Sequence, residues 1–72
     1  MEFRQHAIHC MRDQAISDRS KAETSLIIML EHPAGIGDHS TGDLHNNLNE
    51  ALSSLADAED RIETLDRFVK RC

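Results

Sequence analysis

The chain has 72 residues, a formal net charge of −5, two phenylalanines and no tryptophan or tyrosine. A chain of this length forms at most one small domain, and its core must be built from aliphatic side chains because large aromatic residues are scarce. The acidic balance argues against a nucleic-acid partner, whose phosphates are bound by lysine and arginine, and the longest apolar run, residues 26–30, is too short to span a membrane.

A first helix is predicted over residues 2–31, which contain no proline or glycine. Apolar residues recur at helical spacing on one face, although Asp18 and Arg19 interrupt that face. The run 17–20 leaves open whether this segment is one helix or two, since serine and aspartate side chains compete for the backbone. Because residues 26–30 are apolar nearly all round the helix, we expect that end to be buried on several sides. The predicted apolar face consists of Ile8, Met11, Ala15, Ala22, Leu26 and Met29.

The segment 32–42 contains the only proline and all three glycines, and it is predicted to be a corner where the chain reverses. Pro33 lacks a backbone N–H and disfavours a helical residue before it, so the first helix should end there. Gly35 and Gly37 permit the positive φ that a reversal needs. Ile36 lies between them and is the apolar side chain available to close this end of the hairpin.

A second helix is predicted over residues 43–71. Apolar residues occupy every a and d position of a heptad repeat over about four heptads, which predicts a helix that packs along a seam. Two further apolar residues, Leu52 and Phe68, lie beside the seam and widen it. The a positions are Leu48, Leu55, Ile62 and Val69, and the d positions are Leu44, Ala51, Ala58, Leu65 and Cys72.

The other face of this second segment is charged. An acidic residue precedes a basic residue by four positions at three places, and this order stabilises a helix by about 0.2–0.5 kcal/mol per pair. The pairs are Asp57 with Arg61, Glu63 with Arg67, and Asp66 with Lys70. We interpret this face as exposed to solvent.

Together these elements predict an all-α fold, an antiparallel αα-hairpin that forms a single domain over residues 1–72. A hairpin has only two layers, so one face of each helix stays exposed unless something covers it. Because two-fold dimers are the commonest oligomers, we expect a second copy to complete a homodimeric four-helix bundle; the alternative is a different protein in that place. The predicted interface consists of Leu44, Leu48, Ala51, Leu52, Leu55, Ala58, Ile62, Leu65, Phe68, Val69, Leu26 and Met29.

Histidine is the main sign of chemistry in the chain. Two histidines three residues apart on a helix can chelate a divalent ion, but two ligands do not complete a site. We expect exposed or capping histidines and no cofactor, with a small metal-binding module as an alternative function. The candidate ligands are His6, His9 and Cys10 in the first segment and His32, Asp38 and His39 in the corner.

No arrangement in the sequence is typical of a catalytic site. A nucleophilic serine needs a base that a third group orients, and although Ser40 follows His39 directly, adjacent side chains in a loop or helix start rarely face each other. We therefore expect a noncatalytic interaction or assembly protein, with an acidic inhibitor or adaptor of a host protein as a further alternative. Cys10 and Cys72 show no disulfide spacing, and no leader segment is evident, which favours a reducing, cytoplasmic location.

The string EHPAGIGDH at residues 31–39, followed by LADAED at residues 55–60, resembles short uncharacterised proteins of tailed phages of marine cyanobacteria and related bacteria. The resemblance covers about residues 29–65. It implies a phage accessory or virion-associated protein that works in the cytoplasm of a bacterial host. It implies no catalytic residues.

Overall fold

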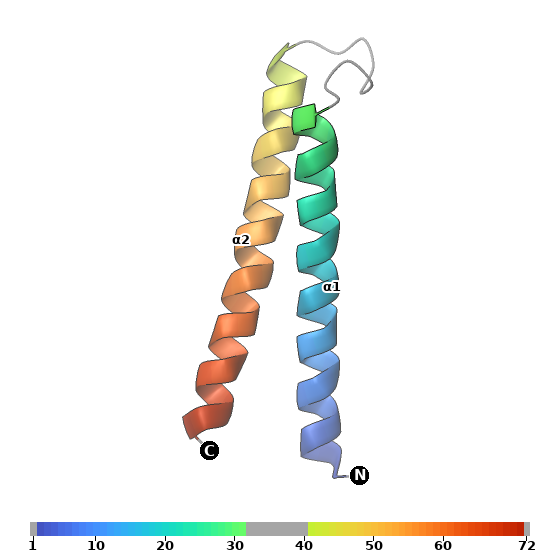
Figure 1. Ribbon diagram of the computed structural model, residues 1–72. Coiled ribbons are helices and arrows are strands. Elements are labelled where there is room, and N and C mark those ends of the chain that lie inside the picture. Colours follow the sequence, from blue (N-terminus) through green and yellow to red (C-terminus); the bar gives the residue numbers. More distant parts are fainter. Residues whose placement is uncertain (1, 32–40, 72) are drawn as a thin grey trace.

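The computed structural model describes residues 2–31 and 41–71, which form two long helices arranged as an antiparallel hairpin (Figure 1). Helix α1 spans Phe3–Glu31 and helix α2 spans Thr41–Arg71. The start of α1 and the end of α2 lie at the same end of the molecule, which we call the open end (Figure 1). Within the described residues there is no strand, so the predicted all-helical hairpin is confirmed for them.

One feature of the helices answers a question that the sequence left open, and another differs from its prediction. Helix α1 is continuous through residues 17–20. The carboxylate of Asp18 bonds other side chains and so does not compete for the backbone. Helix α2 includes Thr41 and Gly42, which were expected to belong to the corner. Asp43 in its first turn is favoured there because a carboxylate complements the positive end of the helix dipole.

Residues 32–40, together with Met1 and Cys72, lie outside the described residues. The predicted turn and some of the candidate metal ligands belong to these residues, so what the sequence indicates about them stays a prediction. These expectations concern Pro33, Gly35, Ile36, Gly37, His32, Asp38, His39 and Cys72.

The two helices meet along a seam of small side chains. Ala15 and Ala22 of α1 are buried, and so are Ala51 and Ala58 of α2. In each helix the two alanines are seven residues apart, so they take equivalent positions in successive heptads. Small side chains let helix backbones approach closely, but they fill little volume. Leu65 is the only larger side chain among the buried residues that the structure describes, so the core is thin.

Helix α2 packs against α1 with the face that its heptad repeat predicts. Three of its d positions are buried, and the remaining described a and d positions are half-buried. Part of the predicted interface is therefore already covered within one chain. The half-buried positions are Leu44, Leu48, Leu55, Ile62 and Val69.

The packed face of helix α1 differs from the predicted face at one position. Met11, predicted on the packed face, is 53% exposed, and Arg12 takes the half-buried position instead. The spacing explains this difference, since buried or half-buried residues recur at alternating intervals of four and three from Ile8 onward. The packed positions of α1 are Ile8, Arg12, Ala15, Arg19, Ala22, Leu26 and Met29.

Candidate interaction surface

The seam separates two broad sides of the hairpin, and these sides expose different chemistry. On the first, which we call the polar side, a shallow hollow is lined by Asp18, Lys21, Ala22, Ser25, Ala51, Ser54, Asp57 and Arg61. On the second, which we call the apolar side, a hollow is lined by Ser20, Glu23, Thr24, Leu26, Ile27 and Leu55. Each hollow is formed by both helices. On α2 the first includes the g positions Ser54 and Arg61, whereas the second includes Leu55, which lies toward the e position, so the two hollows lie on opposite flanks of the seam.

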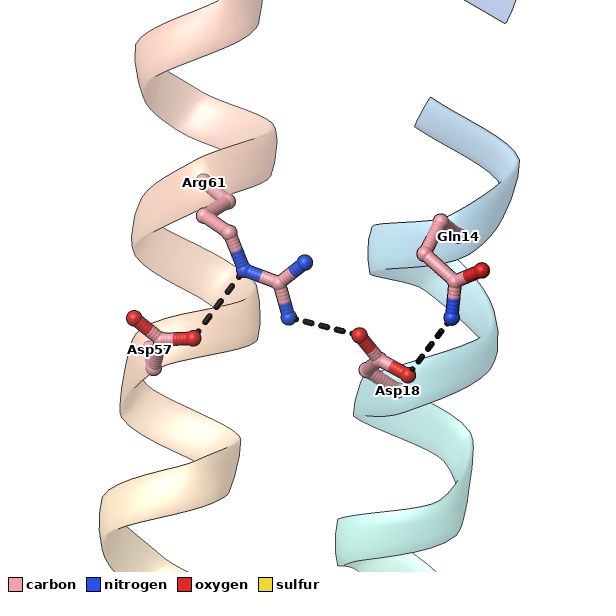
Figure 2. Close-up of polar contacts among 4 residues, drawn as sticks. All are labelled: Gln14, Asp18, Asp57 and Arg61. Carbon is pink, nitrogen blue, oxygen red and sulfur yellow. Dashed lines mark hydrogen bonds and ion pairs between the residues drawn. The ribbon is translucent and has the colours of Figure 1, made fainter. Parts of the chain in front are cut away.

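The centre of the polar side is an ion-pair cluster that joins the helices (Figure 2). The Arg61 guanidinium donates from Nη2 to Asp18 Oδ2 at 2.8 Å and from Nε to Asp57 Oδ2 at 3.0 Å. Gln14 Nε2 donates to the other oxygen of Asp18 at 3.0 Å. Figure 2 shows Arg61 between the two carboxylates, one on its own helix and one on α1. This cluster links positions 43 residues apart and so contributes to the register of the hairpin.

The charges of this cluster shift the protonation equilibria of its members. The hydrogen bond from Arg61, followed by that from Gln14, lowers the pKa of Asp18 below its ordinary value. The hydrogen bond to Asp18 raises the pKa of Arg61. Both groups are therefore held in their charged forms, which is what a structural ion pair requires.

A second ion pair crosses the seam nearer the open end. Arg12 Nη2 bonds Asp66 Oδ1, and both side chains are partly exposed. Asp66 was predicted to pair with Lys70 on its own helix. Arg12 replaces that partner because its seam position lets its side chain reach across to α2. The other two predicted pairs, Asp57–Arg61 and Glu63–Arg67, are confirmed, each at 3.0 Å.

The apolar side carries exposed aliphatic side chains on both helices. Along α1, Ile16, Ile27 and Leu30 recur at spacings of eleven and three residues, which keeps them on one stripe of the helix. On α2, Leu52 lies one turn from Leu55, which lines the hollow of this side together with Ile27. Exposed aliphatic side chains of both helices therefore lie in or next to the same hollow.

The polar side has a smaller apolar spot near the open end. Met11 and Leu65 line a hollow there together with Gln14, Asp60, Arg61 and Thr64. Phe68 lies one turn beyond Thr64 and is about half exposed. Four of the six residues that line this hollow are polar, so the spot does not extend along the hairpin.

The structure divides the predicted interface residues into three groups. Ala51, Ala58 and Leu65 are buried between the helices, and only Leu52 and Phe68 are exposed. The other seven, Leu26 and Met29 on α1 and the five half-buried seam residues of α2, are half-buried. The sequence analysis did not include the exposed residues Ile16, Ile27 and Leu30. The signal for two of them was present in the run 26–30, which is apolar all round the helix and cannot bury every side chain against one partner.

Among the candidate metal ligands, the structure brings His6 and Cys10 together. His6 Nε2 and Cys10 Sγ are 3.7 Å apart on successive turns of α1, and Cys10 is an exposed free thiol. The spacing in the sequence favoured His6 with His9 instead. Within residues 2–31 and 41–71, no group of three or more histidine, cysteine or carboxylate side chains could hold a metal ion.

Comparisons with known proteins identify no relative of the chain. No family model, curated protein or solved structure matches it. Of the two helices described, neither is long and apolar enough to cross a membrane.

Proposed function

We propose that this protein is a noncatalytic interaction or assembly protein that associates with a second copy of itself. The observation that carries this proposal is the incomplete core. No large side chain among the described residues is fully buried, while eight large hydrophobic side chains are at least 36% exposed. Apolar surface left in water favours association, because removing it from water contributes about 25 cal/mol per Å².

The total surface of the chain supports the presence of a further layer. The accessible surface is 5485 Å² for a mass of 8.1 kDa. A compact monomer of this mass exposes about 4,500 Å² by the usual scaling of surface with mass. The excess of roughly 1,000 Å² is similar to the share that one partner contributes to a standard protein interface, about 800 Å².

A biological setting is proposed on the resemblance to phage proteins alone. On that basis the self-associating hairpin is a phage accessory or virion-associated protein in a bacterial cytoplasm. A different protein as the covering layer, including a host protein bound by an acidic adaptor, is the competing proposal.

The test is the solution mass of the purified, reduced protein, measured by light scattering over a dilution series with and without a chelator. We expect a mass near twice 8.1 kDa that falls toward one chain on dilution and does not respond to the chelator. A protein that stays monomeric at all concentrations contradicts self-association. If that monomer is also partly unfolded, the missing layer belongs to another protein.

Metal binding is a second candidate function, favoured by the contact between His6 and Cys10. Two ligands on one tetrahedral zinc ion, with bonds of about 2.3 Å to sulfur and 2.0–2.1 Å to nitrogen, lie roughly 3.6 Å apart. The observed separation of 3.7 Å is close to that value. Zinc should then raise the melting temperature and a chelator should reverse the change, whereas Cys10→Ser should abolish the response.

A further inference from the structure

We propose that the second copy docks on the apolar side of the hairpin, over Ile27 and Leu52, and that the polar side stays exposed in the dimer. This inference rests on the proposed self-association and names the surface that performs it. The two-fold contact places α1 of one copy against α2 of the other, which produces a four-helix bundle.

The shape of the apolar side suits a helical partner of the same length. Both of its helices expose aliphatic side chains, Ile27 and Leu30 on α1 and Leu52 on α2, next to a hollow that Leu26, Ile27 and Leu55 line. A ridge of side chains from another hairpin packs into such a hollow by the ordinary ridges-into-grooves rule. In a two-fold contact Leu52 of each copy meets the hollow beside Ile27 of the other, so the contact is self-complementary.

The area of one side is sufficient for one copy. The hairpin measures 51 × 20 × 15 Å, so one broad side offers about 1,000 Å². A standard interface needs about 800 Å² from each partner. One second copy on one side therefore provides a complete interface, and no contact on the polar side is needed.

The polar side is a poor place for the same partner. Asp18, Asp57 and Arg61 bond one another there, and Lys21 lines the same hollow. Covering these charges would remove them from water, and that desolvation penalty can exceed what the ion pairs return. On the apolar side Glu23 is the only charged residue that lines the hollow. Asp66, which pairs with Arg12, shares the heptad position of Leu52 but lies two heptads nearer the open end, so a partner centred on Ile27 and Leu52 covers fewer charges than one on the polar side.

Two neighbouring isoleucines provide a matched test. Ile27 and Ile28 are 54% and 50% exposed, but only Ile27 lines the hollow of the apolar side. The variants Ile27→Asp and Ile28→Asp carry the same charge change at adjacent positions of one helix. Sedimentation equilibrium should show a dimer dissociation constant raised at least about thirtyfold by Ile27→Asp, the size typical of a central interface residue. Ile28→Asp should change it by less than about threefold.

A second pair makes the same comparison on α2. Leu52 and Phe68 are 55% and 52% exposed, on the apolar and polar sides respectively. Leu52→Asp should weaken the dimer as Ile27→Asp does, and Phe68→Asp should leave it intact. Circular dichroism of each variant separates lost association from lost helix, and Ile27→Ala gives a milder variant if Ile27→Asp does not fold.

The outcomes separate this inference from the proposal beneath it. A wild-type protein that is monomeric overturns both. A dimer that Phe68→Asp breaks and Leu52→Asp does not, or that Ile27→Asp and Ile28→Asp weaken equally, overturns the docking surface while self-association stands. Selective weakening by Ile27→Asp or Ile27→Ala, together with Leu52→Asp, supports it.

Discussion

The two sides of the hairpin are built from the same two helices, yet they do different things. The polar side joins the helices through Arg61 and Asp18, with further bonds from Asp57 and Gln14. The apolar side carries the ion pair of Arg12 with Asp66 near the open end, and farther along the hairpin it exposes Ile27 and Leu52. Both sides therefore link the helices, and the aliphatic surface around Ile27 and Leu52 is available for a partner. The thin alanine seam lies between the two sides and packs the helices together beneath both of them.

The largest effect on the hairpin itself is expected in the seam beneath both sides. Ala58 is fully buried, and Ala58→Leu forces extra volume between closely packed helices. We expect a loss of roughly 1–3 kcal/mol in the free energy of unfolding, measured by thermal or urea denaturation. Ala56→Leu, the same change at an exposed position of α2, is the control and should stay within about 0.5 kcal/mol. Equal losses in both variants would contradict the close packing of the seam.

A gain of association is expected on the apolar side. Glu23 lines the hollow between aliphatic side chains, so a docked partner removes its carboxylate from water. Glu23→Ala should therefore tighten the dimer about tenfold, measured as a lower dissociation constant by sedimentation equilibrium. The control is Glu50→Ala, since Glu50 lines a hollow with Ser54 and Ala51, which also line the polar side. An unchanged dissociation constant in Glu23→Ala would indicate that this side remains exposed to water.

The smallest effect is expected on stability at low pH, through the carboxylate of Asp18 on the polar side. The pKa of Asp18 is lowered in the folded protein by Arg61 and Gln14, so the folded state favours the charged carboxylate. Its contribution to stability is present above the ordinary aspartate pKa and is lost as pH falls through the lowered value. Melting temperatures from pH 7 to pH 2 should therefore decline less steeply at the acid end for Asp18→Asn than for the wild type. An identical acid decline in the two proteins would show that this pair does not stabilise the hairpin.

The sequence pattern alone predicted the packed face of a helix where one hydrophobic repeat dominates. In α2 the heptad repeat predicted the packed face because apolar residues at a and d have no better place to be buried. In α1 the pattern was ambiguous, since Arg12 and Arg19 occupy packed positions and Met11 does not. Long basic side chains can lie in a seam because their aliphatic stems pack while their charged ends reach solvent or an acid. Arg12 does so by bonding Asp66.

The candidate surface was predicted only in part. Leu52 and Phe68 were expected at one interface, and the structure places them on opposite sides of the hairpin. Ile27 and Leu30 belong to a run that was expected to be buried, and within one chain both are more than half exposed. A helix that is apolar all round can bury only some of its side chains against one neighbour. Which side chains are buried depends on how the two helices are aligned and rotated, and the sequence of one helix alone does not specify this.

By itself the sequence determined that this chain is helical over two long segments and which face of the second one is packed. These features follow from backbone preferences and from a hydrophobic period that acts over a few turns. The tertiary structure decided that Asp18 bonds Arg61 and that Arg12 bonds Asp66, over separations of 43 and 54 residues. It also decided that Ile27 remains exposed beside Leu55. Contacts of this kind depend on how two complete helices are aligned, and the alignment is set by the sum of the seam and the ion pairs rather than by any local stretch of sequence.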